Sequence, residues 1–327
     1  MEMTYERWQK KTLRHSFSST GWILLVYYGI MNVSVFLAVF IEMVVGMVGM
    51  IASGNMDDIM LLAEQAAGNA WGYFLAIGIG LVILLCWKKP RFWKNEIWAR
   101  GKPMNPGSFF AILSIFISGQ MIYQIMVMLT ETILNIFGLS IMEGLESMAV
   151  DSSSFSMFLY SGILAPIAEE ILFRGLIQKR LMPYGKKFAI LCSAFTFGIF
   201  HGSLLQSPYA FLVGLVLGYV AAEYSIAWAM VLHMVNNLVI ADMLTRLTMG
   251  LPEMAASLVI WLIIAAFTVA AIVVVIVKRR EIGDYLRRER LNGLYLKCFF
   301  SCPGMIILMI LMGLSMIVTG FVMIGPL

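Results

Sequence analysis

The sequence predicts an all-α, polytopic membrane protein, a bundle of about 8 to 9 transmembrane helices with the N-terminus inside and the C-terminus outside. Three observations predict this class. Of 327 residues, 61% are hydrophobic and only 13% are charged, and the mean hydropathy of +0.87 is far above that of a soluble domain. Apolar runs of about 20 residues recur along the chain. Basic residues gather in the short segments between alternate runs.

Nine apolar runs are candidate spans, if the shorter ones are tilted, re-entrant or shielded by protein. The first is much longer than the apolar region of a signal peptide, so we interpret it as an uncleaved span. The weakest is the sixth, which Ser207 and Pro208 flank on one side and Glu223 on the other. The runs cover approximately residues 21–51, 71–87, 108–138, 156–178, 188–205, 208–223, 226–246, 256–277 and 299–324.

The basic residues predict the orientation of these runs. Of the 23 Lys and Arg residues, 21 lie in residues 1–20, 88–106, 179–187 and 278–297. Short cytoplasmic loops hold most Lys and Arg in membrane proteins, so these segments are predicted to be inside. The net charge of +4 therefore reflects orientation in the membrane, and we expect the lipid bilayer and no nucleic acid as a partner.

We divide the chain into three parts. Residues 1–154 form an N-terminal cytoplasmic arm with three accessory helices, residues 155–247 a core that carries intramembrane ionisable groups, and residues 248–327 two C-terminal helices joined by a basic segment. Ionisable side chains inside a membrane are functional candidates by default, so the core is expected to hold the site. The predicted location is a bacterial plasma membrane.

The segment LAPIAEEILFRGL places two glutamates and an arginine inside an apolar run. In an α-helix, Glu170 and Arg174 lie four residues apart on one face and can neutralise each other. Glu169 points about 100° away and is left over. A spare carboxylate beside another carboxylate in an apolar setting is suited to act as a general base near neutral pH.

Pro166 lies three residues before Glu169. Its missing N–H is expected to free the backbone carbonyl of Gly162. Broken backbone hydrogen bonding at membrane depth is tolerated where it lines a cavity, but a simple kink is an equally good interpretation.

Two further polar pairs lie on separate helices. Phe197 and His201 are four residues apart, as are His233 and Asn237, so each pair shares a helix face. Counted from the inner ends of their helices, Glu169 and these polar groups lie at roughly 11 to 21 Å, a similar depth. A carboxylate, two imidazoles and an amide at one level are the parts of a hydrolytic site.

These three segments resemble the motifs EExxxR, FxxxH and HxxxN/D of the CAAX protease and bacteriocin-processing family of intramembrane endopeptidases, also called the type II CAAX prenyl endopeptidase or Abi family. Here they read EEILFR (169–174), FGIFH (197–201) and HMVNN (233–237). The helix with Gly214 and Gly218 is also similar to the small-residue helix before the third motif. The resemblance covers roughly residues 155–245.

The resemblance implies a glutamic endopeptidase with no cofactor and no covalent intermediate. Glu169, assisted by His201, would activate a water that attacks a substrate carbonyl. His233 and Asn237 would stabilise the oxyanion, and Glu170 and Arg174 would hold the first helix in register. The implied substrate is a peptide or protein at the membrane, which several branches of the family cleave without a prenyl group.

Three alternatives stay open. Glu169, His201 and His233 could instead ligate zinc with an activated water. A non-catalytic membrane scaffold or bacteriocin-immunity protein could use the same helices. A proton-coupled transporter could use the carboxylate and histidines as a relay, although the chain shows no repeat symmetry. Outside the motifs, Gln120 and Gln124 are interpreted as interhelical hydrogen-bonding residues.

Overall fold

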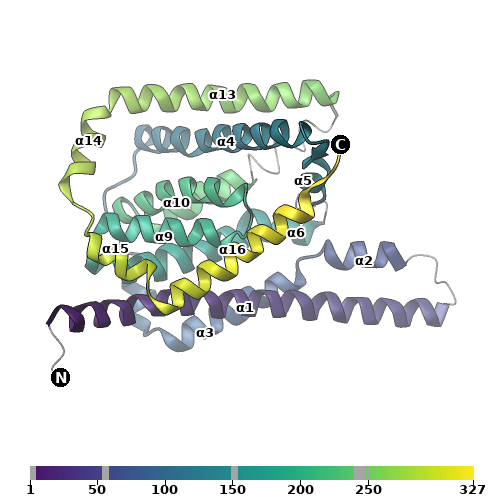
Figure 1. Ribbon diagram of the computed structural model, residues 1–327, viewed down its shortest axis with the longest axis horizontal. Coiled ribbons are helices and arrows are strands. Elements are labelled where there is room, and N and C mark those ends of the chain that lie inside the picture. Colours follow the sequence, from purple (N-terminus) through teal and green to yellow (C-terminus); the bar gives the residue numbers. More distant parts are fainter. Residues whose placement is uncertain (1–4, 54–58, 149–153, 239–247, 249) are drawn as a thin grey trace.

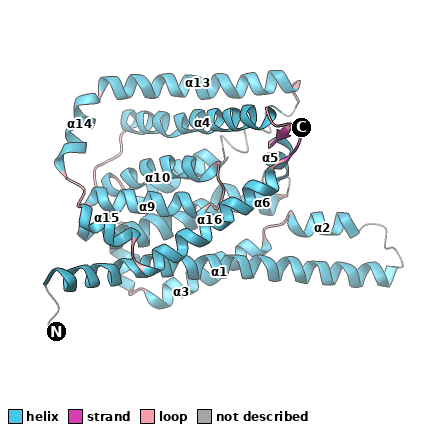
Figure 2. Ribbon diagram, in the orientation of Figure 1, coloured by secondary structure: helices cyan, strands magenta, loops and turns pink. Residues whose placement is uncertain are grey.

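We describe the protein from a computed structural model, which covers residues 5–53, 59–148, 154–238, 248 and 250–327. Nearly all of these residues are helical (Figure 2). An antiparallel pair of two-residue strands joins Leu139 to Pro326 and Ser140 to Gly325. The structure confirms the predicted all-α membrane class.

The elements follow one another in the order of the predicted apolar runs. The α-helices are α1 (Tyr5–Ser53), α2 (Ile59–Ala67), α3 (Trp71–Trp87), α4 (Pro106–Asn135), α5 (Met142–Met148), α6 (Phe155–Leu159), α7 (Ala165–Glu170), α8 (Lys179–Leu181), α9 (Lys186–Phe200), α10 (Gln206–Glu223), α11 (Ile226–Val235), α13 (Glu253–Val277), α14 (Arg279–Arg288), α15 (Gly293–Phe300) and α16 (Pro303–Met323). The segments η1 (Phe92–Glu96), η2 (Tyr160–Leu164) and η3 (Ile171–Gln178) are π-helices, η4 (Met182–Tyr184) is a 3₁₀-helix, and the strands are β1 (Leu139–Ser140) and β2 (Gly325–Pro326).

Among the residues that the structure describes, five helical stretches are long and apolar enough to cross a membrane. They are 6–53, 106–135, 155–184, 254–277 and 303–323, and 71–87 and 226–238 are shorter apolar helices. The predicted runs 188–205 and 208–223 correspond to α9 and α10, which fall outside both groups. The end of the predicted run 226–246, with Asp242 and Arg246, lies outside the described residues.

The N-terminal helix and the C-terminal helices pack against the middle of the chain (Figure 1). Phe17 of α1 is fully buried, and its ring centroid lies 5.4 Å from that of Phe188 on α9 and 5.9 Å from that of Phe299 on α15. The crossing of α1 and α16 is so close that a Cβ on Gly21 would lie 2.2 Å from the carbonyl carbon of Gly304. The predicted accessory segments therefore support the predicted core directly.

The sequence predicted an α-helix for the segment that carries the two glutamates, but the structure shows a mixed helix. Its stretch from 155 to 184 alternates between α and π geometry, with η2 before the glutamates and η3 after them. In η2 the N–H of Ala165 bonds to the carbonyl of Tyr160, five residues back. The register is shifted by one residue relative to an α-helix, which changes the carbonyl that Pro166 leaves free.

Polar side chains around Glu223 and Glu289 connect the basic segments that are predicted to lie inside. The Glu223 carboxylate forms ion pairs with Lys186 at 2.6 Å and Lys102 at 3.1 Å, and it accepts a hydrogen bond from the Tyr285 hydroxyl at 3.3 Å. The Glu289 carboxylate accepts from the backbone N–H groups at the start of α9. These contacts fix α14 against α9 and α10.

Candidate active site

Glu170 and Arg174 form the predicted pair in the protein interior. Both side chains are 0% exposed, and Nη1 of Arg174 donates to Oε1 of Glu170 at 2.8 Å. His233 on α11 joins them, since its Nδ1 lies 3.0 Å from the same carboxylate oxygen. A carboxylate can only accept, so Nδ1 of His233 carries a proton. Two donors from different helices therefore neutralise the buried Glu170.

Glu169 lies outside this pair, as the helix spacing predicted. Its side chain is 29% exposed, and its Oε2 lies 3.7 Å from Nε2 of His233. This separation is longer than a hydrogen bond, and a water lying to one side of both atoms could contact each of them. His233 therefore faces Glu170 with one ring nitrogen and Glu169 with the other.

Phe197 lies at the centre of the polar groups. The Arg174 guanidinium is 4.3 Å above the centre of its ring, a cation–π geometry that suits a buried arginine. The ring centroid is 4.8 Å from that of His201 and 5.7 Å from that of His233. The structure confirms the predicted packing of Phe197 on His201 and adds His233 and Arg174 to the same ring.

His201 ends α9 with a fixed ring orientation. Its Nδ1 lies 2.8 Å from the carbonyl oxygen of Phe197, so Nδ1 is the donor and Nε2 of the neutral ring keeps a free lone pair. Gly202 follows with a φ of +59°, the left-handed conformation that commonly closes a helix. Thr319 of α16 donates to the Gly202 carbonyl at 3.0 Å, so the last membrane helix positions this turn.

Asn237 bonds to the helix backbone close to the position where Pro166 lacks a donor. The expected free carbonyl was that of Gly162, but in the π register of η2 the next bond would run from residue 166 to Ser161. Pro166 has no N–H to donate. Nδ2 of Asn237 donates to the Ser161 carbonyl at 2.8 Å instead. Asn237 thus completes the helix that carries Glu169, and its second amide hydrogen stays available for another acceptor.

Gln178 is a further buried polar residue of this helix, outside the three motifs. It is buried, and its Nε2 donates to the Gly218 carbonyl at 2.8 Å, while Nη2 of Arg174 donates to the Gly214 carbonyl at 3.3 Å. Both glycines of α10 therefore receive side chains from η3. The signal was the four-residue spacing of Arg174 and Gln178, which extends the polar face of the EExxxR helix by one turn.

A second polar network ties the site to α4 and α10. Oδ1 of Asn236 accepts from Nε2 of Gln120 at 3.2 Å and from the Tyr209 hydroxyl at 3.1 Å, and Asn236 donates to Asn237 at 3.1 Å. The predicted interhelical role of Gln120 is confirmed. The HxxxN spacing of the third motif predicts a role for Asn237 and none for its neighbour Asn236.

The groups around Glu169 also include two tyrosines outside the motifs. Tyr27 of α1 and Tyr160 of η2 both interact electrostatically with the Glu169 carboxylate. Glu169 and His233 interact electrostatically with His201. The described residues contain no hydrogen bond between Glu169 and His201 and no group of three His, Cys, Asp or Glu arranged for a metal ion. Neither tyrosine belongs to one of the three motifs, so its position in the sequence does not predict this interaction.

The fold and this arrangement define a class of protein, the multi-pass integral membrane proteins with paired carboxylates and imidazoles inside apolar helices. The family model described as type II CAAX prenyl endopeptidase Rce1-like matches residues 151–239. This match spans 89 of the 327 residues and contains all three motifs. It confirms the resemblance and suggests an intramembrane endopeptidase of the CAAX protease type. No curated protein and no solved structure matches the chain.

Proposed function

We propose that this protein is an intramembrane glutamic endopeptidase that hydrolyses a peptide bond of a membrane-associated peptide or protein, with Glu169 as the general base. The observation that carries the proposal is the contrast between two neighbouring carboxylates. Glu170 is fully buried and held by Arg174 and His233, whereas Glu169 is partly exposed and faces Nε2 of His233 across 3.7 Å. The ion pair explains Glu170 as a structural residue, so Glu169 is the carboxylate that is available to act as a general base.

The attack on the peptide bond begins with a water beside Glu169. The carboxylate takes a proton as the water oxygen bonds to the substrate carbonyl carbon, and a tetrahedral oxyanion forms. His201 assists, because its Nε2 lone pair is free in the neutral ring and can receive that proton and pass it to the leaving amine. The carbon–nitrogen bond then breaks, giving a carboxylic acid and an amine without a covalent enzyme intermediate.

The oxyanion has two candidate donors in this proposal. Because Nδ1 of His233 donates to Glu170, Nε2 carries a proton only when the ring is cationic. The ring lies between the carboxylates of Glu170 and Glu169, and in this proposal Nε2 donates to the oxyanion in that form. The second hydrogen on Nδ2 of Asn237 is the other donor, aligned by the bond to Ser161. Such preorganised donors stabilise developing charge strongly in a dry site.

The test compares membrane peptidomes of cells that express the wild-type protein or Glu169→Gln. We expect peptides with a common new terminus in wild-type membranes and their loss in Glu169→Gln membranes, at equal protein levels. Glu6→Gln is the matched control, since Glu6 lies in the exposed first turn of α1. The non-catalytic scaffold would be favoured by two results together: identical peptidomes, and a Glu169→Gln/His201→Ala double variant that still complements a deletion of the gene.

A further inference from the structure

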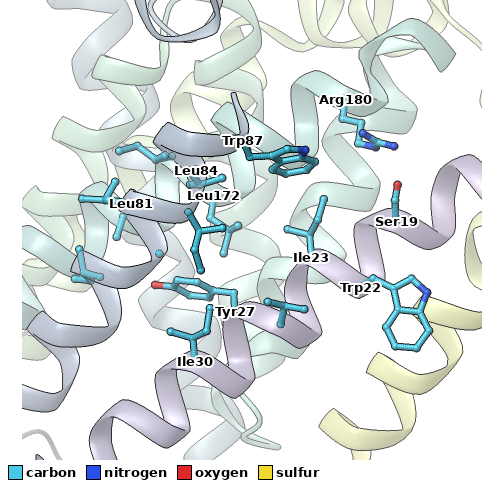
Figure 3. A pocket seen from close by; sticks show the side chains of 16 residues that line it. Ser19, Trp22, Ile23, Tyr27, Ile30, Leu81, Leu84, Trp87, Leu172 and Arg180 are labelled. Carbon is cyan, nitrogen blue, oxygen red and sulfur yellow. The ribbon is translucent and has the colours of Figure 1, made fainter. Parts of the chain in front are cut away.

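An apolar groove runs between α1, α3 and the helix that carries the glutamates. Its volume is about 370 Å³, within the range of sites that hold small molecules. Figure 3 shows Tyr27, Ile30 and Leu81 toward one end, Ser19 and Arg180 toward the other, and Ile23 between them. The exposed side chains of Val26 and Ile83 on its wall would contact lipid in a membrane. The groove therefore opens toward the bilayer.

The length of the groove fits one layer of acyl chains. Ser19 and Ile30 are eleven residues apart on α1, which corresponds to about 16 Å of helix. The hydrocarbon core of a bilayer is about 30 Å thick, so one leaflet is about half of that. A single acyl chain that starts at the Arg180 end would reach Tyr27 and Ile30.

The Arg180 end of the groove is cationic. Arg180 forms no ion pair with any carboxylate that the structure describes, and its buried Nε has no hydrogen-bond partner there. Burial and, secondly, the like charge of Arg180 lower the pKa of Lys88, and Glu96 opposes this. Glu96 is itself paired with Arg91 at 3.4 Å. Two neighbouring cations, one with a buried unsatisfied donor, call for an anion.

Tryptophans border the same end. Trp87 and Trp22 line the groove together with Arg180 and Ser19 (Figure 3), and Nζ of Lys88 lies 4.5 Å from the centre of the Trp87 ring. Indole rings concentrate at the level of lipid headgroups, where one edge is wet and the body is apolar. This end is therefore placed where a lipid phosphate would lie.

We propose that the groove binds an anionic phospholipid of the inner leaflet, the leaflet on the side of the basic segments. One acyl chain would lie along α1 and α3, with the phosphate on Arg180 and Lys88. A guanidinium fork matches phosphate oxygens in two parallel hydrogen bonds. The second cation disfavours lipids with a cationic headgroup. This lipid site does not depend on the chemistry assigned to Glu169. An acyl chain in the groove would still lie close to Glu169, because Ala168 and Tyr27 line the groove.

The test is native mass spectrometry of the full-length protein after incubation with equimolar phosphatidylglycerol and phosphatidylcholine. The wild-type protein should retain phosphatidylglycerol in preference. Arg180→Gln should bind it about tenfold more weakly, the loss of one charge-assisted contact, and Arg180→Lys should be intermediate. Arg287→Gln, which removes an exposed arginine of α14, should match the wild type. Equal retention of both lipids, or no difference between Arg180→Gln and Arg287→Gln, overturns the proposal.

A second pair of variants tests the groove without changing charge. Val26→Trp narrows the groove, whereas Val33→Trp adds the same ring at an exposed position of α1 away from it. Only Val26→Trp should lose bound phosphatidylglycerol. If Val26→Trp kept the lipid and lost peptide cleavage, the groove would hold an apolar substrate segment, and the lipid proposal would be wrong. This pair decides the question even if Arg180→Gln does not fold.

Discussion

At the scale of residues, Glu169 and Glu170 differ because their neighbours differ. The i,i+4 spacing was enough to predict the pairing of Glu170 with Arg174, since helix geometry fixes which side chains share a face. His233 could not be placed by the same reasoning. It lies 63 positions from Glu170, and a sequence gives no distance between two helices. The roles of the four candidate residues in catalysis stay predictions.

The buried ion pair leads to a prediction of stability. Arg174→Gln leaves the 0% exposed Glu170 carboxylate without its guanidinium partner, and breaking a buried pair costs about 3 to 5 kcal/mol. We expect that loss in the free energy of unfolding, measured by denaturation in detergent micelles. Lys10→Gln breaks the exposed pair with Glu6 and should change the free energy of unfolding by less than about 1 kcal/mol. Similar effects of the two variants would contradict the structural role of Arg174.

At the scale of elements, the positions of the helices could be predicted but their internal geometry could not. Hydropathy identified each apolar run, yet nothing in a run distinguishes an α turn from a π turn. In the π register of η2, the Ser161 carbonyl accepts a hydrogen bond from Asn237 on a different helix. Helix spacing directed the prediction to the Gly162 carbonyl, whereas the carbonyl that accepts from a neighbouring helix is that of Ser161, one residue earlier.

A double-mutant cycle tests this exchange between helices. Asn237→Ala should destabilise the wild-type protein, because the Ser161 carbonyl loses its donor. In a Pro166→Ala background the helix regains an N–H, so the same substitution should cost less. We expect a coupling of about 1 kcal/mol between the two sites, measured by unfolding. Strictly additive effects would show that Asn237 does not replace the missing proline donor.

At the scale of the whole molecule, the basic segments and the connections without basic residues lie at opposite ends. The first turns of α1, with α14 and α15, lie at one end in Figure 1, and α5 and the C-terminus lie at the other. This agrees with the orientation predicted from charge. The sequence could not predict how the outer helices support the core, because the ring contact between Phe17 and Phe299 joins segments 282 residues apart.

Reporter fusions test the orientation. Alkaline phosphatase is active only outside the inner membrane, so a fusion after Gly138, beside β1, should be active. A fusion after Gly283 in α14 should be inactive, because that segment is basic and lies at the opposite end. Equal activity at both positions would contradict the orientation and the assignment of the basic end of the groove to the inner leaflet.

The most direct test of the central claim compares Glu169→Gln with Glu170→Gln in purified protein, using a peptide substrate found by peptidomics. Both substitutions remove one carboxylate from adjacent positions. We predict that Glu169→Gln keeps the wild-type unfolding temperature and loses cleavage by at least about a hundredfold, as expected for a general base, whereas Glu170→Gln lowers the unfolding temperature. Wild-type cleavage by Glu169→Gln would contradict the account.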